Sequence, residues 1–239
     1  IQIISDMKRK EERFMQSFSL GQNQISILPG RRPDAPVIYL PSVKDEGACI
    51  SRYLLEYGCP DLTLVSISDL SWNHDMAPWD CPSVFPKGDP FTGGADAYIH
   101  QLTEQILPEA ERRIGSEPVW RGIAGYSLAG LFAIYTLYHT DLFSRAASMS
   151  GSLWFPGFSE YMESHSLAVR PDCIYLSLGK KEHKTRNPLM KTVAHHTEKA
   201  VSCFQSQNIH VTFEWNEGGH FDHPDQRTAA GIQWITEQH

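Results

Sequence analysis

Short runs of apolar residues alternate along the chain with longer segments in which apolar residues recur at helical spacing. The short runs predict eight strands, and two of them, 37–40 and 119–124, are apolar on both faces, as buried parallel strands are. This alternation indicates an α/β fold built from βαβ units, a mostly parallel sheet with helices on both faces. The predicted strands are residues 14–20, 25–28, 37–40, 62–67, 119–124, 146–149, 173–178 and 211–215.

The longer segments predict five helices. The fourth begins at Asn187-Pro188, where asparagine is a good N-cap and proline suits the first helical position. Near the start of the chain, the first two predicted strands are separated only by a short turn that contains Gly21 and Asn23, which predicts an antiparallel hairpin. The predicted helices are residues 47–57, 96–113, 128–138, 188–206 and 225–237.

A single domain over residues 1–239 is predicted, because a chain of 239 residues fits one large α/β unit and contains no internal repeat. One segment, at about residues 68–94, breaks the pattern: it is rich in proline and has no clear period. A loop of that length is usually functional or disordered. Its aromatic residues, among them Trp72 and Trp79, favour burial or a binding surface.

Composition excludes several classes of protein. The formal net charge of -7, with scattered lysines and arginines, argues against nucleic-acid binding. No apolar run approaches the roughly 18 residues of a membrane span, so no membrane association is expected. Five cysteines, an odd number without metal-type spacing, indicate reduced thiols and a cytoplasmic location. The first residues do not resemble a signal peptide, although a chain that starts at Ile1 leaves a removed leader open.

Gly125-Tyr-Ser-Leu-Ala129 follows a predicted strand and opens a predicted helix. This is the setting of a nucleophile elbow, a turn so tight that the positions two before and two after the serine must be small. Gly125 meets this need, and Ala129 stands where the usual pattern has glycine. The pattern predicts Ser127 as a nucleophile. The alternative is an ordinary strand-to-helix turn in which the serine caps the helix.

A serine nucleophile needs a base and a group that orients the base, and elbow folds place the acid and then the histidine after the serine. His220 follows the last strand, and Gly218-Gly219 would let its loop return over the sheet edge. His223 is the competitor, three residues further on, where a capping role would explain it. No cofactor is predicted, and the histidines lack strong metal-site spacing, so no metal is predicted.

Glu182 is the favoured acid because it follows strand 173–178 at its carboxyl end, where α/β sites form. Asp172 precedes the same strand and would lie at the wrong end. Two backbone N–H groups would hold the oxyanion: Leu128, directly after the serine, and a donor after strand 37–40. Pro41 has no N–H, so the second donor is Ser42 or Val43, with Val43 preferred.

Several blocks of sequence resemble the enterochelin-esterase and esterase D group of α/β hydrolases. They include VIYLPS, GYSLAGLFA, SGSLW, SLGKKEHKTRNP and GGHFDH and run from about residue 37 to 224. The resemblance implies the α/β-hydrolase fold and a serine ester hydrolase with Ser127 as nucleophile and His220 as base. In this chain PS replaces the usual HG after the third strand, and some related siderophore esterases use a Ser-His dyad, which leaves open whether Glu182 takes part.

The predicted function is therefore hydrolysis of carboxylic esters through an acyl-enzyme, with a small-molecule ester as the partner. Trp79, Trp154 and Tyr126 are predicted to contact the substrate, because the loops that carry them should emerge beside Ser127. Few basic residues occur in these loops, which predicts small, uncharged acyl or aryl esters. The alternatives are a siderophore trilactone esterase, an acyltransferase on the same fold, and a binding module without turnover.

Overall fold

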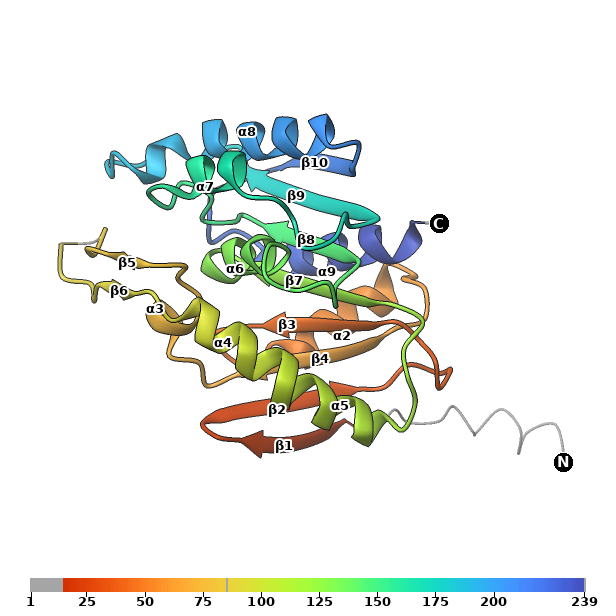
Figure 1. The fold of residues 1–239 in the computed structure, drawn as a ribbon. Coiled ribbons are helices and arrows are strands. Elements are labelled where there is room, and N and C mark those ends of the chain that lie inside the picture. The colour runs from red at the N-terminus through yellow and green to blue at the C-terminus, as the bar shows by residue number, and fades with distance from the viewer. Residues whose placement is uncertain (1–14, 85, 239) are drawn as a thin grey trace, which may run out of the picture.

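The computed structural model describes residues 15–84 and 86–238. Phe14, the first residue of the first predicted strand, lies outside them. An eight-stranded sheet runs through the described part of the molecule in the order β1-β2-β4-β3-β7-β8-β9-β10 (Figure 1). Its strands are β1 (Gln16–Leu20), β2 (Asn23–Leu28), β3 (Val37–Pro41), β4 (Thr63–Ser68), β7 (Arg121–Tyr126), β8 (Arg145–Met149), β9 (Cys173–Gly179) and β10 (His210–Asn216).

The sheet is mostly parallel, as predicted. β1 and β2 form the predicted antiparallel hairpin, and β2 also runs antiparallel to β4. All the pairs from β4 through β10 are parallel. Because β3 pairs with β4 on one side and with β7 on the other, the order of the strands reverses between β3 and β7. Ligands of α/β sheets bind beside such a reversal, at the carboxyl ends of the strands.

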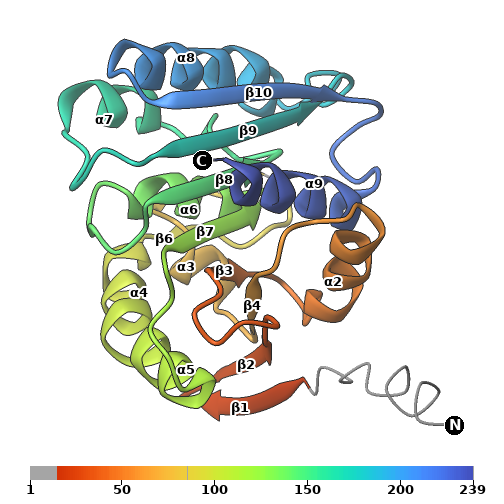
Figure 2. The same ribbon diagram turned by 90° about the vertical axis from the view of Figure 1, so that its right-hand side faces the viewer.

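Helices cover both faces of the sheet, which confirms the predicted fold class. Figure 2 shows α2 (Gly47–Glu56) and α9 (Pro224–Glu237) together on one face. The opposite face carries α6 (Leu128–Thr136), α8 (Val193–Ser206) and the long helical segment that begins with α4 (Ala95–Gln101). Each face has its own buried apolar cluster.

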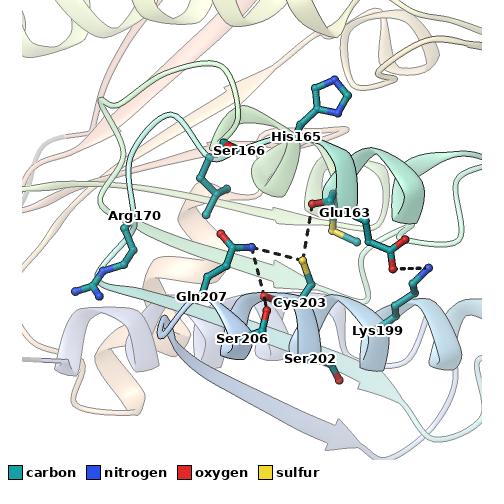
Figure 3. A pocket seen from close by; sticks show the side chains of 11 residues that line it. Glu163, His165, Ser166, Arg170, Lys199, Ser202, Cys203, Ser206 and Gln207 are labelled. Carbon is teal, nitrogen blue, oxygen red and sulfur yellow. Dashed lines mark hydrogen bonds and ion pairs between the residues drawn. The ribbon is translucent and has the colours of Figure 1, made fainter.

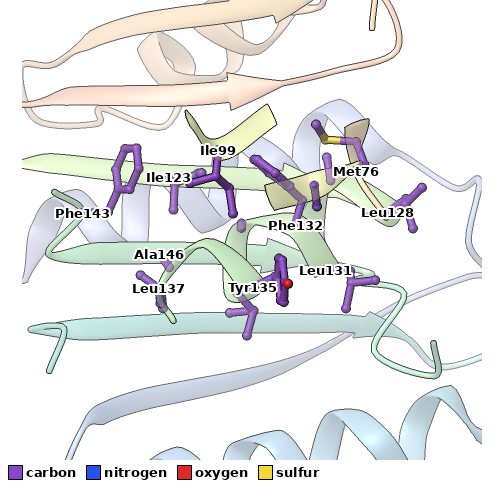
Figure 4. Packing of buried hydrophobic residues seen from close by; sticks show 14 of the residues in the cluster. Met76, Ile99, Ile123, Leu128, Leu131, Phe132, Tyr135, Leu137, Phe143 and Ala146 are labelled. Atoms are coloured by element: carbon purple, nitrogen blue, oxygen red, sulfur yellow. The ribbon is translucent and has the colours of Figure 1, made fainter. Parts of the chain in front are cut away.

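Helix α6 is the most enclosed of the elements near the serine. Every residue from Leu128 to Thr136 is buried, because the helix lies between the sheet and the α4 segment. Figure 4 shows Phe132 of α6 packed among Ile99 of the α4 segment, Ile123 of β7 and Met76. Burial on all sides fixes the helix and with it the turn that precedes it.

Two differences from the sequence prediction have local causes. The predicted helix 96–113 is interrupted by a π-helical turn (Leu102–Ile106) before α5 (Leu107–Ile114). Pro108 has no N–H, and its ring would crowd the carbonyl of Glu104 in a regular helix. The predicted strand 119–124 is observed as Arg121–Tyr126, because Val119 is 56% exposed and pairing with β3 begins at Arg121.

The segment 68–94 is less irregular than predicted. It contains a short helix, α3 (Trp72–Asp75), and a two-stranded ribbon formed by β5 (Asp80–Cys81) and β6 (Phe91–Thr92). Helix α7 (Phe158–Ser164), which begins after Gly157 at φ 83°, was also not predicted. In residues 15–84 and 86–238, no helix has the length and apolar character needed to cross a bilayer.

Candidate active site

Ser127 occupies a strained turn between the end of β7 and the start of α6. Its backbone lies at φ 60° and ψ −121°, a conformation that residues with a side chain rarely adopt. Its N–H donates to the carbonyl of Met149 at 3.0 Å, which ties the turn to β8. A Cβ atom on Gly125 would lie 2.2 Å from the carbonyl oxygen of Ala129. The need for glycine at this position is therefore steric, as the elbow pattern indicated.

His220 reaches the serine from the loop after β10. Its Nε2 lies 3.0 Å from Ser127 Oγ. Gly218, at φ 90°, lets the chain reverse after β10, and the hydroxyl of Tyr126 donates to the carbonyl of His220 at 2.6 Å. The alternative base, His223, is exposed at the N-cap of α9. The structure thus brings His220, and not His223, to the serine.

Glu182 lies on the other side of the imidazole. Its Oε2 is 2.8 Å from His220 Nδ1, and its Oε1 accepts hydrogen bonds from Ser150 Oγ at 2.6 Å and from the N–H of Gly179 at 2.7 Å. Only 3% of its side chain is exposed. Burial acts to raise the pKa of Glu182, but the hydrogen bonds from His220 and Ser150 outweigh it and hold the pKa below its ordinary range.

These contacts define the tautomer of the neutral imidazole. An ionised carboxylate can only accept, so the His220 nitrogen that faces Glu182, Nδ1, carries the proton. Nε2 is then free to accept the proton of Ser127 Oγ. The three side chains form a continuous hydrogen-bonded path with the geometry of a serine-histidine-acid triad. Asp172, the other acid considered, lies at the opposite end of β9 near Arg145.

The backbone around the serine provides two candidate oxyanion donors. Leu128 is the first residue of α6, and the N–H groups of the first turn of a helix have no partner within the helix. The N–H of Ser42 donates to the carbonyl of Ile67 at 2.9 Å. Of the two residues considered after β3, this leaves Val43, which is exposed and lines the same cavity as Ser127.

Ser127 and His220 lie in a cavity of about 400 Å³ at the carboxyl edge of the sheet. Its walls come from the loop after β3, the segment 68–94, the Ser152–Trp154 stretch and the loop after β10. They are mostly apolar. The residues that line it are Leu40, Pro41, Ser42, Val43, Glu46, Trp72, Asn73, Gly88, Asp89, Phe91, Tyr126, Ser127, Leu128, Ser152, Trp154, Met190, His220, Phe221, Pro224 and Thr228.

Two of the three predicted substrate contacts, Tyr126 and Trp154, line this cavity. Trp79 does not, so the structure does not bring this third predicted residue to the cavity. Its ring packs 5.9 Å from that of Phe155 and 6.2 Å from that of Tyr135, while its Nε1 donates to the carbonyl of Pro156. Trp79 therefore anchors the segment 68–94 to the body of the protein.

Several residues of the site were missed in the sequence. Phe221, next to His220, is 88% exposed at the cavity, and Met190 reaches it from the segment before α8. Ser150 follows β8 as Glu182 follows β9, so its place at the end of a parallel strand was a usable signal. Arg227, whose guanidinium contacts Glu182, gave no signal in the sequence. An arginine in a helical pattern is normally expected on the surface.

A larger cavity, of about 760 Å³, lies between α7, α8 and residues 165–170 and shares no lining residue with the cavity at Ser127. Figure 3 shows its walls, where Cys203 of α8 and Gln207, directly after the helix, face the α7 side and Lys199 pairs with Glu163 at 2.9 Å. Among the described residues, no serine that lines this cavity makes a hydrogen bond to its one histidine, His165, whose Nδ1 lies 3.0 Å from the hydroxyl of the adjacent Ser164. Cavity size alone does not locate the chemistry here.

A metal centre is likewise not found in the described part of the chain. Within residues 15–84 and 86–238, no group of three or more histidine, cysteine, aspartate or glutamate side chains is arranged to hold a metal ion.

The fold and this constellation define an α/β hydrolase with a serine at its elbow. The model of a family described as "Putative esterase" matches residues 40–223, about three quarters of the chain. The chain belongs to this family and is a serine carboxylic-ester hydrolase, which confirms the resemblance noted in its sequence blocks.

Individual relatives are distant. The uncharacterized protein YbbA of Bacillus subtilis is 24% identical over 184 residues, which cover 74% of this chain and 74% of YbbA. Among solved structures, the siderophore hydrolase EstA from Aspergillus nidulans superposes with a TM-score of 0.74 at 17% identity, over 96% of both chains. An IroE-like serine hydrolase from Shewanella oneidensis gives 0.74 at 17% identity, over 92% of this chain and 79% of that one. These structures share the α/β-hydrolase fold.

Proposed function

We propose that the protein hydrolyses esters through an acyl-enzyme formed on Ser127, with His220 as the general base and Glu182 as the acid that orients it. One observation carries this proposal: the unbroken path from Ser127 Oγ through His220 to Glu182, with distances of 3.0 and 2.8 Å, at the wall of an apolar cavity. A serine hydroxyl is a poor nucleophile until such a path removes its proton.

The reaction has two halves. Ser127 Oγ attacks the acyl carbon while His220 Nε2 takes its proton, and the N–H groups of Leu128 and Val43 stabilise the oxyanion. His220 then returns the proton to the leaving alcohol as the C–O bond breaks. In the second half water attacks the acyl carbon while His220 Nε2 takes one of its protons. His220 then gives this proton to Ser127 Oγ as the bond between Oγ and the acyl carbon breaks, which releases the carboxylic acid and regenerates the serine.

Labelling with a fluorophosphonate tests the nucleophile, because only an activated serine reacts. We expect wild-type protein to be labelled at Ser127 and to hydrolyse p-nitrophenyl acetate. Ser127→Ala and His220→Ala should each lose activity by several orders of magnitude, and His223→Ala, the matched control, should keep it. More than about a tenth of wild-type activity in Ser127→Ala would refute the assignment and would favour a binding module or another nucleophile.

The charge of the cavity supports uncharged esters with a short acyl or aromatic group as substrates. Trp72, Trp154 and Phe91 offer apolar contact. The charged side chains at the cavity are Glu46 and Asp89, and among the described residues no lysine or arginine lines it. A polyanionic substrate would meet like charge and no basic clamp.

A second candidate substrate class is a siderophore ester. It is favoured by the likeness to EstA and to the enterobactin and salmochelin hydrolase IroE, which matches 99% of this chain with a TM-score of 0.69 at 14% identity. The acidic residues at the cavity distinguish uncharged from anionic siderophore esters. They favour an uncharged hydroxamate triester over a ferric catecholate trilactone, whose three catecholates leave it strongly anionic.

Measuring kcat/KM for a neutral aryl acetate, a hydroxamate triester and a catecholate trilactone separates these possibilities. We expect the neutral esters to be preferred, and Glu46→Gln with Asp89→Asn to improve use of the trilactone alone. Equal or better use of the trilactone by wild type would contradict the charge argument. Added acceptor alcohols should not divert the acyl group, whereas an acyltransferase would transfer it to them.

We also propose a cytoplasmic location. All five cysteines are free thiols, and reduced thiols are typical of that compartment. Labelling of the thiols in intact cells before and after permeabilisation would test it, and protection before permeabilisation is expected.

A further inference from the structure

Arg227, in the first turn of α9, connects the loops that follow four neighbouring strands. Its side chain is 4% exposed. Nη1 lies 3.2 Å from Tyr126 Oη at the end of β7, 3.2 Å from Ser150 Oγ after β8, and 3.3 Å from Glu182 Oε1 after β9. Nη2 donates to the carbonyl of Glu217 after β10 at 2.7 Å. One buried guanidinium thus joins all the segments that carry the proposed triad.

The chemistry of arginine fixes the direction of the neighbouring hydrogen bonds. A guanidinium can only donate, so the hydroxyls of Tyr126 and Ser150 accept from Arg227 and direct their own protons elsewhere. Tyr126 donates to the carbonyl of His220 at 2.6 Å, and Ser150 donates to Oε1 of Glu182 at 2.6 Å. Two short paths therefore lead from Arg227, one to the base and one to the acid.

We propose that Arg227 is a positioning residue for the ester hydrolase, an inference that rests on the proposed function of the triad. Through Tyr126 it holds the backbone of His220. Directly and through Ser150 it holds Oε1 of Glu182, which leaves Oε2 directed at the imidazole. A planar fork that is always charged suits this task, and a lysine would make fewer of these contacts.

Loss of Arg227 should impair turnover more than binding, because it contacts the triad and is not among the residues that line the cavity. Misplacement of reacting groups by about 1 Å can cost roughly 10²-fold. Removing a buried positive charge also favours the protonated form of the carboxylate-imidazole pair. The acid limb of kcat/KM against pH should therefore move to higher pH, which a merely structural role would not cause.

The test uses Arg227→Met and Arg227→Lys in the full chain, with p-nitrophenyl acetate as substrate and active sites counted by fluorophosphonate labelling. We expect Arg227→Met to lower kcat per labelled site about 10²-fold with little change in KM, and Arg227→Lys to be intermediate. Arg145→Met is the matched control. Arg145 is also buried and also bonds α9, through the carbonyl of Ile235 at 2.6 Å, but lies at the far end of the helix. Its loss should lower the melting temperature without changing kcat per site or the pH profile.

Two further measurements cover the case in which Arg227→Met does not fold. Tyr126→Phe and Ser150→Ala each remove one path, and their effects on kcat should combine less than additively with that of Arg227→Lys. The far-downfield proton resonance of His220 Nδ1–H reports the contact with Glu182 without any turnover, so it tests positioning even if wild type is not labelled. An unchanged resonance, kcat and pH profile in Arg227→Met, or in Arg227→Lys if only that variant folds, would overturn the proposal, as would strict additivity with Arg227→Lys.

Discussion

Glu182 shows how one buried carboxylate is oriented by its neighbours. Its two oxygens have different partners: Oε1 accepts from Ser150, Gly179 and Arg227, and Oε2 faces His220. An ionised carboxylate in a buried position needs such partners to stay charged. The arrangement matters for catalysis because an oriented imidazole, and not merely a nearby one, accepts the serine proton.

Replacing Glu182 with Gln should lower kcat by about 10²- to 10⁴-fold, since the amide neither fixes the tautomer of His220 nor stabilises the imidazolium. Steady-state kinetics on a neutral aryl ester would measure this. Asp172→Asn, at the opposite end of the same strand, should leave the rate unchanged. A loss of less than about fivefold in Glu182→Gln would indicate a Ser-His dyad.

Sequence reasoning located those residues whose place follows from chain order. Ser127, His220 and Glu182 each follow a predicted strand, and the carboxyl ends of parallel strands meet at one edge. The position of Trp79 could not be predicted in the same way. Its loop emerges near the site, but the direction of an aromatic side chain depends on packing partners such as Phe155. Arg227 could not be found, since its burial depends on a network spread over four loops.

At the scale of elements, the elbow between β7 and α6 depends on the absence of a side chain at position 125. The fully buried helix α6 is held on both sides, so the turn cannot relax by moving the helix. The strands were predictable because short apolar runs bounded by turn residues leave few alternatives. The interruption at Pro108 and the short elements in 68–94 have no periodic signal of their own.

Gly125→Ala should therefore damage both stability and activity. The added methyl would lie 2.2 Å from the carbonyl of Ala129, which must move and shift the serine with it. We expect a loss of about 1–3 kcal/mol in the free energy of unfolding and more than about a tenfold loss of kcat, measured by denaturant unfolding and ester hydrolysis.

Gly58→Ala is the control for this substitution. Gly58 also has a positive φ, 69°, but nothing lies within 4 Å of its Cβ position. It should cost about 1 kcal/mol from the left-handed backbone alone and leave kcat unchanged. Wild-type activity in Gly125→Ala would show that the elbow tolerates expansion.

At the scale of the whole molecule, the stability of the fold depends on the charge of one group at the site, the Glu182 carboxylate. Segments far apart in sequence meet at one sheet edge, and the interactions of the Glu182 carboxylate help to hold them together. Because its pKa in the folded protein lies below its ordinary value, its contribution is fully present above the unfolded pKa of about 4.3 and is lost as pH falls through the folded pKa.

The difference in melting temperature between wild type and Glu182→Gln should consequently shrink as the pH falls below about 4.3. Thermal unfolding followed by circular dichroism at several pH values below about 5 would measure it. A gap that widens as the pH falls below about 4.3 would contradict the depressed pKa of Glu182.

The backbone of Ser127 has a consequence for laboratory evolution. At φ 60° and ψ −121° a glycine would be at ease, whereas a serine is strained by an amount on the order of 1–3 kcal/mol. Part of that gain would be offset by the greater freedom of glycine in the unfolded chain. A selection for thermal stability alone would thus favour replacement of Ser127 by glycine, which removes the nucleophile. Variant libraries of this protein should therefore be selected for ester hydrolysis as well as for thermal stability, so that the stabilised variants keep their activity.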